Sequence, residues 1–166
     1  MLLFPGMACQ IDSFVGKGSN AIVYMGSYPD EQSGNLRHRV LVKELFPFEE
    51  HGQIYRDAAG DICCAADAAP TMELHRLSFQ RGNEVHLKLL AESPEEIGAN
   101  INTFSLHRTL YSVLGFSGGR SLDRELERAG ASAVLLSVHV HRMLGILDVL
   151  ETFHRSGFLH LDISPD

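Results

Sequence analysis

Apolar residues follow two different spacings along the chain, and the first third has the spacing of strands. Short runs rich in β-branched residues, separated by polar turns with Gly, Ser and Asn, predict strands at residues 11–16, 21–28 and 38–45. Two shorter runs, 53–55 and 61–64, are joined by RDAAG and predict a small hairpin. Residues 1–10 are interpreted as a lead-in to the first strand.

The spacing changes to that of a helix near residue 71. Leucine and valine recur at helical spacing as far as residue 92, and Thr71 is expected to cap the N-terminus of this helix. Alternation then returns, which predicts two further strands at 101–107 and 109–116.

The C-terminal part is predicted to be mainly helical. Ser121 is expected to cap a short helix that ends near Gly130, and a long helix is predicted from residue 132 to residue 156. The apolar arc of the long helix is too wide for a surface helix. We therefore expect it to be buried on more than one side.

Composition narrows the class of protein. With 166 residues, 45% of them hydrophobic and 21% charged, the chain can form the core of one domain and is not compositionally disordered. The formal net charge of −7 argues against a dedicated nucleic-acid binder. The longest apolar stretch, at 133–150, is interrupted by His, Arg and Asp, so no membrane span is predicted. Three cysteines without a C-x-x-C pattern, and no targeting segment, predict a cytoplasmic protein with reduced thiols.

A pair of glycines between the first two strands is the first candidate for chemistry. Gly16 and Gly18 leave the backbone N–H groups open to a phosphate, although such a pair also forms ordinary hairpin turns. A Walker A loop is excluded because Lys17 is followed by Gly18 rather than by Ser or Thr. A Rossmann loop is excluded because residues 21–28 read as a strand and not as a helix.

Lys43 and the segment 158–166 are two further candidates. A lysine in an apolar strand is costly to bury unless an anionic group meets it, and the alternative is an edge strand whose lysine points to solvent. The segment FLHLDISPD contains His160 and Asp162, and it reads either as a catalytic loop or as a loop in which Asp162 caps a turn.

The order of these features resembles the protein kinase signature set, and most of all that of the bacterial eukaryotic-like Ser/Thr kinases. A glycine loop, a lysine in the third strand, a helix with a glutamate, two strands, a buried helix and His-x-Asp follow one another. The resemblance implies an α+β, kinase-like fold. Residues 11–116 would form an N-lobe, a five-stranded antiparallel sheet with one helix. Residues 117–166 would form a partial C-lobe of two helices and the start of the catalytic loop.

The resemblance assigns ATP-binding roles to five residues of the first strands. Gly16 and Gly18 match the first two glycines of the family's loop, and Val15 and Val23 would bracket the adenine. Lys43 would hold the α- and β-phosphates. ATP is therefore the implied nucleotide, and a protein Ser or Thr hydroxyl is the implied acceptor.

The helix should supply a glutamate that pairs with Lys43. Glu84, in FQRGNEVHLKLL, is the expected partner and Glu73 is the alternative. The connection between Lys43 and the helix is longer than usual for the family, so the spacing does not decide between the two glutamates.

The resemblance also assigns roles at the end of the last strand and in the C-terminal loop. Leu114 falls at the gatekeeper position, and backbone groups of Gly115, Phe116 and Ser117 are expected to meet the adenine edge. Asp162 would be the catalytic aspartate that orients the substrate hydroxyl and accepts its proton. Leu161 stands where an arginine is usual and Ser164 where a lysine is usual, so slow or unusual phosphoryl transfer is expected.

The sequence predicts no metal site within the 166 residues, because its histidines lack partners at ligand spacing. The Mg²⁺ ligands, an asparagine and an Asp-Phe-Gly motif, are expected beyond residue 166, so we expect a kinase fragment that transfers little phosphate by itself. The alternative is an inactive kinase-like module that binds nucleotide or protein. In either case a partner or a missing lobe would cover helix 132–156. A third interpretation is an unrelated α+β protein in which Lys43 and Glu84 lie far apart.

Overall fold

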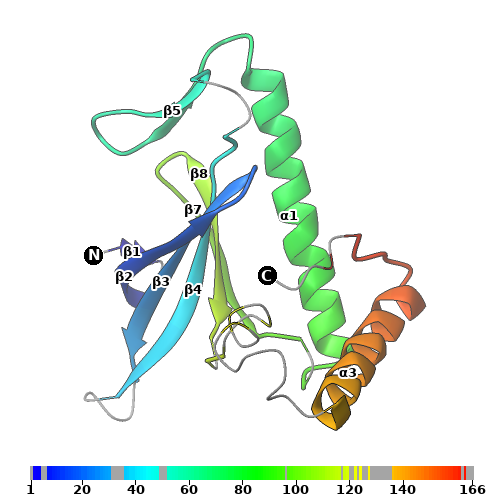
Figure 1. Ribbon diagram of the computed structural model, residues 1–166. Helices are drawn as coiled ribbons and strands as arrows, with labels where there is room; N and C mark the ends of the chain where they lie inside the picture. The colour runs from blue at the N-terminus through cyan, green and yellow to red at the C-terminus, as the bar shows by residue number, and fades with distance from the viewer. Residues whose placement is uncertain are drawn as a thin grey trace. The chain divides into compact units, whose positions relative to one another are not determined.

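The computed structural model in Figure 1 describes residues 2–4, 7–30, 36–48, 52–95, 97–116, 118–119 and 136–161, with single positions at 122, 124, 127 and 163. The chain divides into two compact units. The first comprises Met1–Lys88 and Gly98–Phe116, and the second comprises Leu89–Ile97 and Ser117–Asp166.

The first unit is built on an antiparallel sheet with the strand order β1-β2-β3-β4-β8-β7. Its strands are β1 (Leu2–Phe4), β2 (Met7–Lys17), β3 (Ala21–Pro29), β4 (Arg37–Leu45), β7 (Asn100–Leu106) and β8 (Thr109–Gly115). The predicted five-stranded antiparallel sheet with one helix is confirmed. The interpretation of residues 1–10 as a lead-in is wrong, because β1 pairs with the start of β2 and adds a short sixth strand at the edge.

Helix α1 (Ala69–Glu92) covers one face of this sheet (Figure 1). Met72 and Phe79 of α1 pack into a cluster with Leu45 of β4 and Leu110 of β8. The helix begins two residues before Thr71, which is therefore not its N-cap. Pro70 explains the earlier start, because a proline in the first helical turn has no N–H that would need a partner.

The other face of the sheet holds a second core, made of Cys9, Val40, Val42, Phe104, Tyr111 and Val113. The rings of Phe104 and Tyr111 stack with their centroids 5.1 Å apart. Side chains alternate between the two faces of a strand, so Val42 and Glu44 point to this core while Lys43 points to the side of α1.

The insertion between β4 and α1 forms the predicted hairpin, with strands β5 (Ile54–Arg56) and β6 (Ile62–Cys64). The Oδ1 atom of Asp57 accepts hydrogen bonds of 2.9 Å from the N–H groups of Ala59 and Asp61. These bonds close the turn, and they hold the pKa of the Asp57 carboxyl below its usual value.

In the second unit, helix α3 (Leu136–Arg155) lies within the predicted range 132–156. The helix ends at Arg155. Gly157 follows with a φ of 81°, which suits glycine, and the N–H of Phe158 donates to the carbonyl of Phe153 at 2.9 Å. Ser121 and most of the predicted short helix lie outside the described residues. No helix in the described ranges is long and apolar enough to cross a membrane.

The wide apolar arc of α3 is not covered. A stripe of its side chains is between 47% and 58% exposed, and it comprises Val140, Met143, Leu144 and Leu147. The expectation that this helix is buried on more than one side is therefore not met among the described residues.

Candidate functional site

A row of four residues crosses the sheet on the side of α1. Gly16 of β2 pairs with Val23 of β3, Val23 pairs with Lys43 of β4, and Lys43 pairs with Ser112 of β8. Residues directly opposite each other in a sheet point to the same face, so the side chains of Val23, Lys43 and Ser112 are neighbours, with Gly16 at the end of the row. Strand β4 lies between β3 and β8, which excludes the alternative that Lys43 sits on an edge strand.

Lys43 lines a cavity of about 270 Å³ between this face and α1. The strand side of the wall contains residues from three separate stretches of sequence, namely Asn20, Ala21, Lys43, Leu45, Ser112 and Leu114. Among the described residues, no carboxylate forms an ion pair with the Lys43 ammonium. The cavity therefore presents an exposed cation to an incoming anion.

Asn83 anchors the middle of α1 to the sheet beside this cavity. Its Oδ1 atom accepts hydrogen bonds from Ser112 Oγ at 2.7 Å and from Asn100 Nδ2 at 3.2 Å. Its own Nδ2 donates to the carbonyl of Phe79 at 3.0 Å. Sequence reasoning missed Asn83 and Ser112. The available signal was a serine within an otherwise apolar strand, two residues before Leu114.

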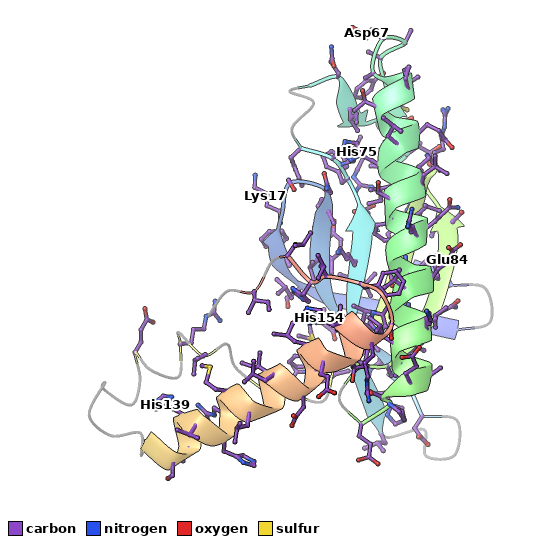
Figure 2. All side chains as sticks on the ribbon, turned by 90° about the vertical axis from the view of Figure 1, so that its right-hand side faces the viewer. Lys17, Asp67, His75, Glu84, His139 and His154 are labelled. Carbon is purple, nitrogen blue, oxygen red and sulfur yellow. The ribbon has the colours of Figure 1, made fainter. Side chains whose placement is uncertain are left out.

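The expected pair between Lys43 and Glu84 is not formed. Glu84 is exposed and does not line the cavity, whereas His75 does. The two residues are nine positions apart, which at about 100° per residue places them on opposite sides of α1 (Figure 2). Glu73, the alternative partner, is eleven residues before Glu84 and shares its side. Both glutamates therefore point away from Lys43.

The glycine loop leaves its backbone open. A Cβ atom added to Gly16 or Gly18 would meet no atom within 4 Å, so both positions face free space. The N–H of Gly18 donates to the carbonyl of Ala21 at 2.9 Å and closes the turn. The N–H of Phe48 donates to the carbonyl of Ser19 at 2.7 Å, which ties the loop to the segment after β4. This open and anchored backbone fits the approach of a phosphate.

The two valines expected to bracket the adenine do not line the cavity. Val15 lies in a register shift of β2 between Phe14 and Gly16 and is 52% exposed. Val23 is half-buried directly beside Lys43.

The segment after the gatekeeper position is already engaged within the protein. Leu114 lines the cavity as expected for that position. The N–H of Gly115, however, donates to the carbonyl of Ala99 at 2.7 Å, and the N–H of Phe116 donates to the carbonyl of Arg39 at 3.3 Å. These two N–H groups are therefore paired within the protein, Ser117 lies outside the described residues, and the expected contact of this segment with the adenine edge stays a prediction.

Asp162 lies outside the described residues, but its neighbours are described. The His160 ring packs against the Phe153 ring of α3 with centroids 5.4 Å apart. Leu161 is 88% exposed and has a φ of 62°, a left-handed conformation that is strained for leucine. In the described ranges, no three His, Cys, Asp or Glu side chains gather where they could hold a metal ion.

On the opposite face of the sheet, β4 carries a buried carboxylate, that of Glu44, which is the centre of a hydrogen-bonded cluster. The Glu44 carboxylate, only 1% exposed, accepts hydrogen bonds from Arg56 Nη2 at 2.7 Å and from Tyr24 Oη at 2.9 Å. The Tyr111 hydroxyl donates to its other oxygen. Burial and the hydrogen bond to Glu44 raise the pKa of Tyr24 to about 12, and they raise the pKa of Tyr111 as well. This cluster joins the insertion hairpin to the strand that carries Lys43.

Comparison with known proteins establishes the fold. No protein-family model matches the sequence, and no curated protein matches it. The chain is similar to a solved structure described as the apo form of PpkA-294, a bacterial Ser/Thr kinase, with a TM-score of 0.74 and 22% sequence identity. The match covers 95% of this chain and 52% of that one, so the chain spans about half the length of that structure. The sheet and α1 therefore form a kinase-like N-lobe.

Proposed function

We propose that these 166 residues are the nucleotide-binding part of an ATP-dependent protein Ser/Thr kinase. The observation that carries this proposal is the cavity at Lys43, which joins the residues that follow the glycine loop, the strand lysine and Leu114. These three features were predicted separately from the sequence. The kinase-like fold supports the proposal because it brings them together in one place.

Each part of the site has a chemical task in this function. The Lys43 ammonium would neutralise the α- and β-phosphates, and the free space beside Gly16 and Gly18 would let these phosphates approach the backbone of the loop closely. Asp162 would orient the hydroxyl of a Ser or Thr substrate. Mg²⁺, which supplies charge neutralisation in phosphoryl transfer, would be held by residues beyond Asp166.

A kinase-like module that binds nucleotide without transferring phosphate is the second candidate function. It is favoured by one observation, namely that the α1 glutamates point away from Lys43. The third interpretation, an unrelated α+β protein, also expected an unpaired Lys43 and Glu84. The fold likeness over 95% of the chain argues against that interpretation.

Titration of the chain with a fluorescent ATP analogue tests nucleotide binding. Lys43→Met should weaken the affinity at least about tenfold while leaving the melting temperature unchanged, because the side chain is exposed. Lys88→Met is the matched control, since it removes the same charge from a residue outside the cavity. Equal affinity of the Lys43→Met variant and the wild type, or no saturable binding, would refute the proposal.

The DNA that follows the codon for Asp166 separates the two candidate functions. An in-frame continuation that encodes the asparagine and Asp-Phe-Gly would support the kinase, and a stop codon would support the binding module. By themselves the 166 residues should transfer negligible phosphate. Robust turnover that depends on Asp162 would contradict this expectation.

A further inference from the structure

A second cavity, of about 400 Å³, lies in the first unit and shares no lining residue with the cavity at Lys43. Its wall is formed by the β5–β6 hairpin, the first two turns of α1 and the turn between β7 and β8. The lining residues on which its chemistry depends are Cys63, Ala69, Met72, Glu73, Arg76 and Arg108. We call this cavity the arginine pocket.

Hydrogen bonds between its three segments hold the arginine pocket together. The N–H of Ile62 in β6 donates to the carbonyl of His107 in the β7–β8 turn at 2.8 Å. The Arg76 guanidinium of α1 donates to the carbonyl of Arg108 in the same turn. The Arg108 Nη1 atom lies 4.0 Å from the Cys63 Sγ atom on the pocket wall. Both guanidiniums are thus positioned at one opening.

Two arginines line the pocket in a chain of net charge −7, and the Asp57 carboxylate lies 3.7 Å from the Cys63 Sγ atom at its wall. Two guanidiniums line it against one carboxylate, that of Glu73, and neither guanidinium forms an ion pair with a carboxylate of the described residues. Burial and the nearby Asp57 carboxylate raise the pKa of the Cys63 thiol. The pocket therefore offers cations and not a thiolate.

The β7–β8 turn keeps Arg108 in place at a conformational cost. His107 and Arg108 have φ values of 48° and 56°, both in the left-handed region. A two-residue hairpin turn with positive φ at both positions normally uses Asn and Gly, because other side chains are strained there. An arginine occupies a position where glycine would be unstrained, which indicates that its side chain has a use.

We propose that the arginine pocket binds a phosphate monoester group. A planar guanidinium donates two parallel N–H groups to phosphate oxygens, and two guanidiniums at one opening can share a doubly charged phosphate. The volume of about 400 Å³ admits more than the phosphate itself. The group could arrive on a small metabolite or on a phosphorylated Ser or Thr side chain, since both present the same chemistry.

Calorimetric titration of the whole chain with O-phosphoserine, a phosphoserine peptide and inorganic phosphate tests this proposal, with unmodified serine as the blank. Arg108→Gly is the decisive variant. It should weaken O-phosphoserine binding at least about tenfold and leave the melting temperature unchanged or higher, because glycine is unstrained at this φ. Arg76→Gln should weaken binding similarly. Arg81→Gln removes the same charge from α1 outside the pocket and should have no effect.

The remaining outcomes also decide the matter. Tighter binding of the phosphoserine peptide than of O-phosphoserine identifies a protein ligand, and the reverse identifies a small molecule. Absence of binding of all three probes at millimolar concentration overturns the proposal. Binding that survives Arg108→Gly but is lost in Lys43→Met also overturns it, because the phosphate would then occupy the nucleotide cavity.

Discussion

Glu44 holds a carboxylate in the interior, one residue from Lys43 and on the opposite face of β4. Glu44→Gln would leave the Arg56 guanidinium without its counter-charge. Removing one partner of a buried ion pair is strongly destabilising. The Arg56 side chain is 35% exposed, however, so water screens part of the charge that is left unpaired. We expect a decrease of about 2 kcal/mol in the free energy of unfolding, measured by urea denaturation. Glu84→Gln, at an exposed position, is the control and should change it by less than about 0.5 kcal/mol. Equal effects of the two substitutions would contradict the charged pairing.

The raised pKa of the Tyr24 hydroxyl predicts how the free energy of unfolding depends on pH in the alkaline range. Its folded-state pKa of about 12 lies above the usual 10, so the folded chain retains the proton more tightly than the unfolded chain. The stabilisation is complete below pH 10 and is lost as the pH rises towards 12. Urea denaturation across this range should show a falling free energy of unfolding, with a shallower slope in Tyr24→Phe. An unchanged slope in that variant would show that Tyr24 does not titrate in this way.

At the level of elements, the strands could be predicted and the orientation of α1 could not. Alternation between apolar and polar residues is a local signal, and it located every strand of the sheet except β1. Helix α1 carries two apolar arcs. One contains Met72 and Phe79, which are packed in the core, and the other contains Leu74 and Leu77, which are exposed. Spacing alone does not say which arc meets the sheet.

At the candidate site, too, the sequence predicted local features but not how they come together in the fold. Lys43, the glycines and Leu114 were found because each stands in a recognisable local pattern. The alignment of Gly16, Val23, Lys43 and Ser112 in one row depends on strand register, including the shift between Phe14 and Gly16, which is set by contacts distant in sequence. Asn83 was missed for this reason, since its hydrogen bonds reach β7 and β8.

The orientation of α1 leads to a different expectation for Glu84 than the kinase resemblance does. Because Glu84 faces away from Lys43, Glu84→Gln should change the affinity for a fluorescent ATP analogue by less than about twofold. Lys43→Met, measured in the same titration, should weaken it at least about tenfold. Comparable losses in the two variants would mean that α1 rotates to pair Glu84 with Lys43 when nucleotide binds.

The whole chain spans about half the length of the kinase structure that it resembles. Its two units differ in how far their apolar side chains are buried. In the first unit, α1 closes one face of the sheet and contributes to both cavities from different sides. In the second, α3 leaves an apolar stripe open. The function proposed above therefore places nucleotide binding in the unit with a packed core, and it places the proposed role of Asp162 outside the described residues.

The apolar stripe of α3 predicts self-association of the 166-residue chain. Val140, Met143, Leu144 and Leu147 recur at helical spacing and form one exposed surface, and contiguous surfaces of this kind favour association in water. Sedimentation velocity should show concentration-dependent oligomers of the wild-type chain. The double substitution Leu144→Glu and Leu147→Glu should shift it to monomers, because charges on the stripe oppose its burial. His141→Glu adds charge to the same helix without removing apolar surface and should leave the oligomers in place. A wild-type chain that remains monomeric at high concentration would show that the stripe does not drive association.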